Sequence, residues 1–266
     1  MKISYVQIKP EFGEKSANID KALKLMNTKS AELYVLPELF NSGYVFASKA
    51  ELENLAEIPG EGPTFNALGE FARTNNCAVV FGFPEKAPDA YYNSAAFIDF
   101  KGNMKIYRKL HLFYEEKHFF LPGNYQLETF DYNGAKLGMM ICYDWIYPEV
   151  TRILALKGAD IICHTVNLVM PYCQEAMKTR SIENRVFTIT ANRIGEENRG
   201  GKEFTFTGKS QITDCKGNVL NRSPEDKEDI FVADINIEDA RVKDINSLNN
   251  LWSDRRVEFY KRLGER

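Results

Sequence analysis

Two nearly identical turn sequences divide the chain into similar halves. They are DFKGN at residues 99–103 and DCKGN at residues 214–218, which agree at four of five positions and lie 115 residues apart. Turns favour Asp, Gly and Asn for separate physical reasons, so a match this short can also arise by chance. The matching order of the elements around each turn supports a true repeat.

The first half is expected to begin with a strand, a helix and a second strand. Apolar residues spaced three and four apart predict an amphipathic helix over residues 19–26, between apolar runs at residues 3–8 and 33–36. A further helix is expected after Pro63, and residues 77–83 are typical of a buried strand. A hairpin around the first turn closes this half.

The second half repeats this order. Its expected elements are a strand over residues 137–141, a helix over 148–157 that Gly158 ends, a strand over 161–164, a helix over 171–185 and a strand over 187–191. A second hairpin follows around the second turn. Two such halves pack most simply sheet against sheet, with helices on both outer faces. We therefore expect an α/β chain of the α+β type, folded as a four-layer αββα sandwich with two mixed sheets.

One domain is expected over residues 1–266, because no linker rich in Pro, Gly or Ser separates the halves. Residues 236–266 form a C-terminal segment after the last expected strand. Its apolar and aromatic residues, among them Trp252 and Phe259, suggest that it crosses to a partner subunit.

Charge and composition exclude several classes of function. The 34 Lys and Arg against 37 Asp and Glu give a net charge of −3, so no broad basic surface exists for nucleic acid or an anionic membrane. No run approaches the roughly 20 apolar residues of a membrane span, and the first residues lead directly into an apolar strand. We therefore expect a cytoplasmic protein with no membrane partner.

Neither a metal nor a cofactor is expected. The five cysteines have no C-x-x-C spacing, and the three histidines form no paired Cys/His ligand set. An odd number of cysteines leaves at least one thiol without an intramolecular partner. Dinucleotide-binding and nucleophile-elbow motifs do not occur.

Cys142 is a candidate nucleophile. It follows the apolar run at residues 137–141, and the next helix begins only at Pro148, so the thiol lies on a strand-to-helix turn. Such a turn lifts a side chain from the sheet edge and brings backbone N–H groups near it. A buried structural cysteine is the alternative on position alone, and none of the histidines has an evident relation to Cys142.

Two charged residues fall where they could serve this thiol. Glu38 follows Pro37 at the carboxyl end of an inner strand, where ligands bind in α/β sheets. Lys109 follows the first hairpin between apolar neighbours that would draw its stem inward. Taken singly, each would more often be an exposed charge.

Together these segments resemble the nitrilase superfamily of carbon–nitrogen hydrolases over nearly the whole chain. The matching sequences are LPELF around Glu38, YRKLHL around Lys109 and ICYDWIYPE around Cys142. The resemblance implies a Glu38, Lys109 and Cys142 triad, with Glu116 as a second glutamate that orients Lys109 and the substrate. It also implies the αββα sandwich and a homodimer or higher homo-oligomer formed through helix layers.

The roles that the resemblance implies fit the chemistry of each side chain. Glu38 would act as general base toward the Cys142 thiol and later toward water. Lys109 would stabilise the oxyanion together with the backbone N–H of Tyr143, since a compact charge in a dry pocket acts strongly on a nearby anion. The acyl group would be held on Cys142 as a thioester.

The shape of the pocket, rather than the triad, selects the substrate. Candidates for substrate binding, which lie just beyond strand ends, are Tyr44, Tyr114, Trp145 and Asn167. Core packing is the alternative for the aromatic residues. A substrate carboxylate would need a cation, for which Arg193 and Lys117 are candidates.

The expected reaction is hydrolysis of a small linear amide or nitrile to a carboxylic acid and ammonia. Tyr143 and Asp144 after the cysteine favour amidases and carbamoylases, whereas residues 110–117 and 167–172 resemble archaeal-type aliphatic nitrilases. Three alternatives remain open: an N-carbamoyl amino acid or amine amidohydrolase, a thiol acyltransferase and, least favoured, a non-catalytic dimeric binding module.

Overall fold

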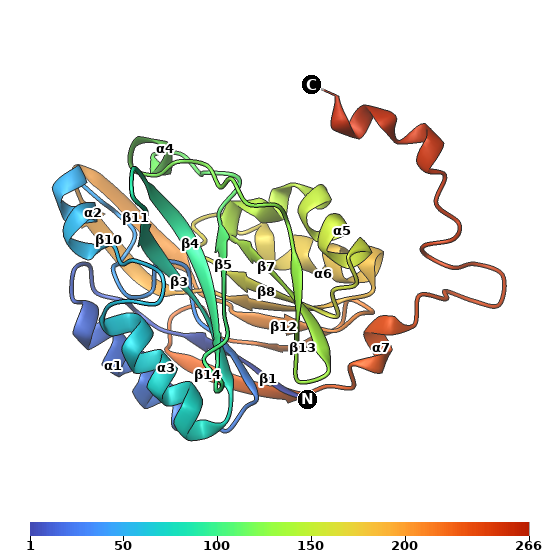
Figure 1. Ribbon diagram of the computed structural model, residues 1–266, viewed down its shortest axis with the longest axis horizontal. Helices are drawn as coiled ribbons and strands as arrows, with labels where there is room; N and C mark the ends of the chain where they lie inside the picture. The colour runs from blue at the N-terminus through green and yellow to red at the C-terminus, as the bar shows by residue number, and fades with distance from the viewer. Residues whose placement is uncertain (266) are drawn as a thin grey trace.

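Two six-stranded mixed sheets lie at the centre of the computed structural model, which describes residues 1–265 (Figure 1). The first sheet contains, in spatial order, β14 (Asp229–Asp234), β1 (Lys2–Gln7), β2 (Leu33–Val35), β3 (Ala78–Lys86), β4 (Tyr91–Asp99) and β5 (Met104–Arg108). The second contains β13 (Val219–Arg222), β12 (Gln211–Thr213), β9 (Phe187–Ala191), β8 (Ile161–Thr165), β7 (Ala135–Ile141) and β6 (Thr129–Tyr132).

Both sheets have the same topology. Three neighbouring strands run parallel, namely β1, β2 and β3 in the first sheet and β7, β8 and β9 in the second. A hairpin, β4–β5 or β12–β13, continues the sheet on one side, and one antiparallel strand, β14 or β6, closes the other. The repeat expected from the sequence is therefore confirmed.

The two repeated turns join these hairpins and make the same hydrogen bonds. In each, the carboxylate of the first residue, Asp99 or Asp214, accepts bonds of 2.8–2.9 Å from two backbone N–H groups and from the asparagine side chain of the fifth residue. The glycine at the fourth position has φ 83° in both turns, a conformation that other residues rarely adopt. This shared bonding explains why the two turns keep the same residues.

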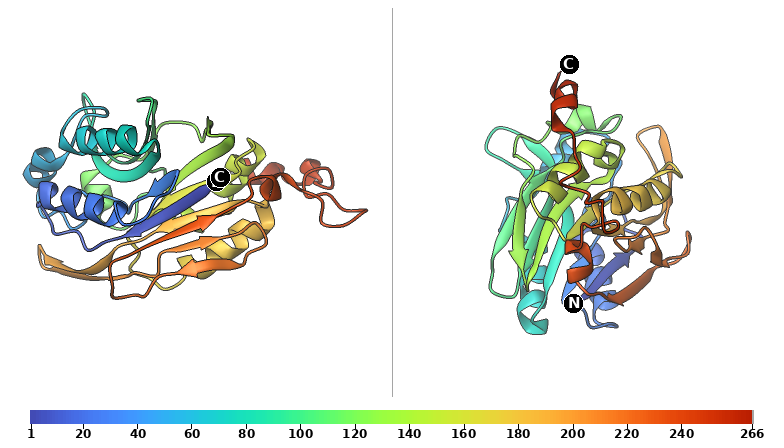
Figure 2. Two further views of the ribbon diagram at one scale, coloured as in Figure 1. Left: turned by 90° about the horizontal axis from the view of Figure 1, so that it is seen from below. Right: turned by 90° about the vertical axis from the view of Figure 1, so that its right-hand side faces the viewer.

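Helices cover both outer faces. α1 (Lys15–Met26) and α3 (Pro63–Asn75) pack on the first sheet, and α5 (Pro148–Leu156) and α6 (Cys173–Asn184) pack on the second. Apolar side chains fill the space between the sheets and beneath α1 and α3. Figure 2 shows the resulting helix–sheet–sheet–helix order from two further sides, which confirms the four-layer αββα sandwich.

Several short elements were not expected from the sequence. They include α2 (Lys49–Leu55), α4 (Glu116–Phe119) and a separate hairpin of β10 (Ile194–Arg199) with β11 (Lys202–Thr207). β10 is polar after Ile194, and in β11 the alternation of apolar and polar residues is confined to Phe204 and Phe206, so the apolar pattern of this hairpin is weak.

The C-terminal segment runs along the outside of the sandwich and then extends away from it (Figure 1). It contains α7 (Glu238–Arg241) and the 3₁₀ turns η2 (Val257–Phe259) and η3 (Lys261–Gly264). Trp252 packs beside Arg152 of α5, whereas Leu248 is 88% exposed and Phe259 is 71% exposed. Within residues 1–265 no helix is both long and apolar enough to span a membrane.

Candidate active site

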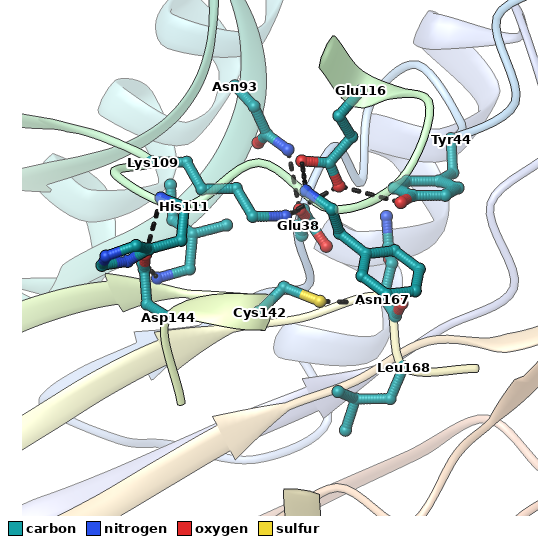
Figure 3. A network of polar contacts seen from close by, with 12 residues as sticks. Glu38, Tyr44, Asn93, Lys109, His111, Glu116, Cys142, Asp144, Asn167 and Leu168 are labelled. Atoms are coloured by element: carbon teal, nitrogen blue, oxygen red, sulfur yellow. Dashed lines mark hydrogen bonds and ion pairs between the residues drawn. The ribbon is translucent and has the colours of Figure 1, made fainter. Parts of the chain in front are cut away.

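The site lies where the carboxyl ends of the parallel strands of both sheets come together. Glu38 follows β2, Cys142 follows β7 and Asn167 follows β8, while Lys109 comes directly after β5 of the first hairpin. Figure 3 shows these side chains around one shared space, with Lys109 and Cys142 directed toward it from neighbouring segments. The edge of the sheets that was expected to bind ligands therefore gathers the expected residues.

Glu38 is fully buried and only half of its carboxylate has partners. Oε1 accepts a hydrogen bond of 2.7 Å from Asn93 Nδ2 and lies 2.7 Å from Lys109 Nζ. Oε2 has no partner. The backbone of Glu38 approaches β3 so closely that a Cβ on Gly82 would lie 2.4 Å from the Glu38 Cα, so glycine is required there.

Lys109 is fully buried between two carboxylates. Its Nζ lies 2.7 Å from Glu38 Oε1 and 2.7 Å from Glu116 Oε1. Burial by itself lowers the pKa of this ammonium, but the charges of Glu116, Glu38 and Cys142 outweigh it and raise the pKa above its ordinary value. Lys109 is therefore a fixed positive charge in a dry setting.

Glu116 begins α4 and holds Lys109 from the other side. Its Oε1 also accepts the Tyr44 hydroxyl at 2.8 Å, and its Oε2 accepts the backbone N–H of Phe113 at 3.1 Å. Burial raises the pKa of Glu116 to about 7; Lys109 opposes this shift and Glu38 adds to it. Two carboxylates and one ammonium therefore share a single buried cluster.

Cys142 is the first residue of the 3₁₀ turn η1 (Cys142–Ile146) and has φ 41°, a left-handed conformation that few residues other than glycine adopt. Its carbonyl faces His164 Nε2 at 3.1 Å, and its Sγ lies 3.8 Å from the backbone carbonyl of Asn167. Burial raises the pKa of the thiol well above 9, and the charge of Glu38 adds to this effect more than Lys109 relieves it. The resting side chain is therefore a neutral thiol that needs a base.

Asp144 connects the turn that carries Cys142 with the segment that carries Lys109. Its Oδ2 accepts the backbone N–H of Ile141 at 3.0 Å and the Tyr107 hydroxyl at 2.8 Å. Its Oδ1 accepts the backbone N–H of His111 at 3.1 Å and lies 2.8 Å from His111 Nδ1. Tyr107 and His111 stand two residues before and two residues after Lys109, so one buried carboxylate holds both segments in register.

A pocket beside the thiol, called here the thiol pocket, holds about 270 Å³ of space, part of it open to solvent. Its lining, which carries no charged side chain, consists of Phe113, Cys142, Tyr143, Trp145, Asn167, Leu168, Val169 and Met170. Two of the four substrate-binding candidates, Trp145 and Asn167, line this pocket. Both polar atoms of the Asn167 amide are buried and have no hydrogen-bond partner in the part of the chain that the structure describes.

A second pocket, called here the Glu116 pocket, lies next to Glu116. Tyr44 and Tyr114 line it, together with Phe119, Phe204 and other residues. Tyr114 is 63% exposed, whereas Tyr44 is held by its hydrogen bond to Glu116. An ion pair between Lys202 and Glu115 lies at this pocket, so the β10–β11 hairpin contacts the residue that precedes α4.

Arg193, one of the two candidate cations for a substrate carboxylate, is engaged within the protein. Arg193 is fully buried, forms an ion pair with Glu197 and packs its guanidinium 3.9 Å from the centre of the Phe206 ring. Glu197 in turn accepts the backbone N–H groups of Tyr44 and Val45. Lys117 is exposed and lines neither pocket.

Sequence reasoning missed three polar residues of the site. Asp144, His164 and Asn93 were not assigned a place in it, although Asn93 contacts Glu38 directly and His164 contacts the carbonyl of Cys142. Tyr107, Lys109 and His111 stand at every second position. In an extended chain such residues point to the same side, and this spacing is the signal that could have indicated a shared partner for Tyr107 and His111.

All five cysteines are free and buried, and no group of three His, Cys, Asp or Glu side chains within residues 1–265 is arranged to hold a metal ion. The charged cluster around Lys109 instead suits acid–base chemistry at a carbon centre. A thiol, a carboxylate with an unpartnered oxygen and a buried ammonium are groups that can serve as nucleophile, base and oxyanion-binding cation.

Comparison with known proteins agrees with this geometry. The family model described as carbon-nitrogen hydrolase matches residues 2–243. A protein named nitrilase from Pyrococcus abyssi is 46% identical over 98% of this chain and 100% of its own length, and an (R)-stereoselective amidase from a Pseudomonas species is 34% identical over 85% of this chain and 82% of its own. The structure of an amidase from Nesterenkonia sp. AN1 is similar in fold, with a TM-score of 0.81 and 24% identity over 99% of both chains.

Proposed function

This chain belongs to the carbon–nitrogen hydrolase family of the nitrilase superfamily, and we propose that it converts small linear amides or nitriles to carboxylic acids and ammonia through a thioester on Cys142. Hydrolysis of a carbon–nitrogen bond follows from the family. The choice of substrate and the roles of the side chains are the proposal.

The unpartnered oxygen of Glu38 carries this proposal. Because Oε1 is held by Asn93 and Lys109, Oε2 is the oxygen free to accept a proton in the site. Transfer of the Cys142 proton to Glu38 leaves the net charge of the buried cluster unchanged, whereas ionisation of the thiol to solvent would add a negative charge. Glu38 therefore activates the thiol as substrate arrives.

Attack forms the carbon–sulfur bond and moves an electron pair onto the carbonyl oxygen. Lys109 is the cation available to that oxyanion, and it stays in place because Glu38 and Glu116 both hold it. The backbone N–H of Tyr143, in the first turn of η1, is the second donor, since the first N–H groups of a helical turn have no partner within it.

Collapse of this adduct breaks the carbon–nitrogen bond. The leaving nitrogen takes the proton from Glu38 and departs as ammonia, which leaves the thioester. Glu38 then takes a proton from water as the water attacks the thioester, and the acid leaves as the proton returns to Cys142. With a nitrile, the thiol adds across the triple bond to give a thioimidate, and water converts it to the thioester with loss of ammonia.

The uncharged lining of the thiol pocket supports neutral substrates. No Lys or Arg lines that pocket, and Arg193 is committed to Glu197. A substrate carboxylate there would lose its hydration without gaining a cation. N-carbamoyl amino acids are therefore the weaker alternative. The names of the two relatives, a nitrilase and an amidase, support both of the favoured bond types.

Ammonia release from short aliphatic amides, dinitriles and carbamoyl amino acids, measured beside Cys142→Ala, tests this function. We expect wild-type release from amides or nitriles and none from the variant. Release that requires an added amine acceptor would indicate the acyltransferase instead. No release from any compound, together with slow alkylation of Cys142, would indicate a binding module.

We also propose that the enzyme is a homodimer. The outer face of α5 and α6 exposes Ile153, Leu156 and Ile182, which are between 40% and 51% exposed. The C-terminal segment extends from the same side of the molecule, with Leu248 and Phe259 uncovered (Figure 1). Burial of both surfaces against a second copy would remove this apolar area from water.

A further inference from the structure

We propose that Asn167 determines specificity in the thiol pocket by binding an uncharged hydrogen-bonding group of the substrate, and that a second carboxamide is the group it fits best. This inference rests on the proposed function, because it concerns the part of the substrate beyond the bond that is cleaved. It adds a chemical requirement for that part of the molecule.

The amide of Asn167 is an unusual group to leave without partners. The residue is only 3% exposed, yet neither Oδ1 nor Nδ2 has a hydrogen bond within the described protein. Buried amides normally satisfy both atoms, and an unmade bond in a dry site is unfavourable. A ligand that supplies a donor and an acceptor would remove this deficit.

The backbone of Asn167 lies beside the thiol that we propose to attack the substrate. Its own backbone carbonyl lies 3.8 Å from Cys142 Sγ, and the next residue is fixed by a 3.0 Å hydrogen bond from Leu168 N to Asn192 Oδ1. In Figure 3, Asn167 lies on the opposite side of Cys142 from Lys109. A substrate held between Lys109 and the thiol would direct its remaining atoms toward Asn167.

The side chains around Asn167 indicate which chemical class of substrate group can bind its amide. The other side chains that line the thiol pocket are aromatic or aliphatic apart from the thiol itself, and none is charged. A carboxamide offers one donor and one acceptor and can pair with both atoms of the asparagine amide. A carboxylate would satisfy only Nδ2 and would bring an unpaired charge, whereas an alkyl group would satisfy neither atom.

Three substrates of nearly equal shape separate these possibilities. Succinamide, succinamate and 4-methylpentanamide share the same cleavable amide and chain but end in a carboxamide, a carboxylate and an isopropyl group. For the wild-type protein we expect kcat/KM for succinamide to exceed that for each of the other two by about tenfold or more, as one or two net hydrogen bonds allow. Malonamide and its carboxylate and isopropyl counterparts are one carbon shorter. They test whether the distance between the cleaved amide and the second group determines the contact with Asn167.

Asn167→Leu should remove this preference. We expect the ratio of kcat/KM for succinamide to that for 4-methylpentanamide to fall to about one or below, since the variant keeps the volume and loses both polar atoms. Met170→Leu is the matched control: it alters the same pocket without a polar change, so both substrates should shift together and their ratio should persist. If the leucine variant does not fold, Asn167→Asp is the substitute. It keeps the shape of the side chain and should lose part of the preference for succinamide.

A binding measurement keeps the test independent of turnover. In Cys142→Ala, calorimetry should give a Kd for succinamide about tenfold lower than in the Cys142→Ala, Asn167→Leu double variant. An unchanged substrate ratio in Asn167→Leu, or equal Kd values in this pair, would overturn the role of Asn167. Failure of the wild-type protein to hydrolyse any of the substrates, with the difference in Kd intact, would overturn the proposed hydrolysis and leave the Asn167 subsite standing.

Discussion

Glu38 and Lys109 form a fully buried ion pair with 2.7 Å between Oε1 and Nζ. The pair uses one oxygen of the carboxylate and leaves the other without a partner. In the proposed mechanism this contact holds the cation for the oxyanion and leaves the other oxygen of Glu38 to act as base. The consequences of this assignment can be measured.

Glu38→Gln should abolish most turnover without disrupting the site. Glutamine can still present an oxygen to Asn93 and Lys109, but it cannot take the proton of Cys142. We expect kcat for amide hydrolysis to fall about a hundredfold or more. Ammonia release measures this change, with Glu128→Gln as a control because Glu128 is an exposed partner of Lys157 far along the chain. Turnover within twofold of wild type would rule out the assigned base.

The carboxyl of Glu116 should make stability depend on pH. Its pKa is raised to about 7 in the folded protein, first of all by burial. Between its ordinary pKa and about 7 the folded state holds a proton that the unfolded chain has released, so stability falls as pH rises through this range. Relative to Glu116→Gln, we expect the free energy of unfolding of the wild type to fall by about 3 kcal/mol between pH 5 and pH 8. Urea unfolding at pH 5 and pH 8 measures this free energy for both proteins. If wild type and Glu116→Gln differ by the same amount at both pH values, the assignment is contradicted.

Asp144 should act as a positioning residue. Asp144→Ala removes the carboxylate that joins Tyr107 and His111 to the turn before Cys142. Loss of that register should lower kcat by about tenfold to a hundredfold while KM changes less, because the reacting groups are misaligned rather than removed. Steady-state kinetics separates the two parameters, and Asp144→Asn, which keeps one acceptor oxygen, should restore part of kcat. If the loss of kcat in Asp144→Ala and Asp144→Asn simply follows the loss of thermal stability in each variant, the role of Asp144 is purely structural.

Removal of residues 246–266 should weaken the proposed dimer. The truncation deletes Leu248 and Phe259, whose exposed side chains have little to contact within one subunit. We expect light scattering to show a shift toward monomer at micromolar concentration, with the sandwich still folded by circular dichroism. A truncated protein that stays fully dimeric would show that the C-terminal segment is not part of the interface.

Much of the fold could be predicted from local patterns. The parallel strands are short apolar runs, the four outer helices have helical spacing, and the turn repeat indicates two similar halves because it encodes one set of hydrogen bonds. The β10–β11 hairpin was not predicted, because its apolar alternation is confined to Phe204 and Phe206 and its two strands form a sheet of their own.

The site, too, could be predicted only in part. Glu38, Lys109 and Cys142 stand at strand ends within recognisable motifs, so their gathering at one edge could be expected. The contacts of Asp144 with His111 and of Asn93 with Glu38 join residues 33 and 55 positions apart, which no local pattern encodes. Arg193 was a candidate cation for a substrate carboxylate, but it forms a buried ion pair with Glu197, four residues further along the chain.

The central claim, a thioester on Cys142, is tested most directly by hydroxylamine trapping during amide hydrolysis. Hydroxylamine competes with water for a thioester, so the wild-type protein should form the hydroxamate at the expense of the acid, and Cys142→Ala should form neither. If ammonia is released while the acid is the only acyl product at every hydroxylamine concentration, or if Cys142→Ala retains turnover, water attacks without an acyl-enzyme and the account is wrong.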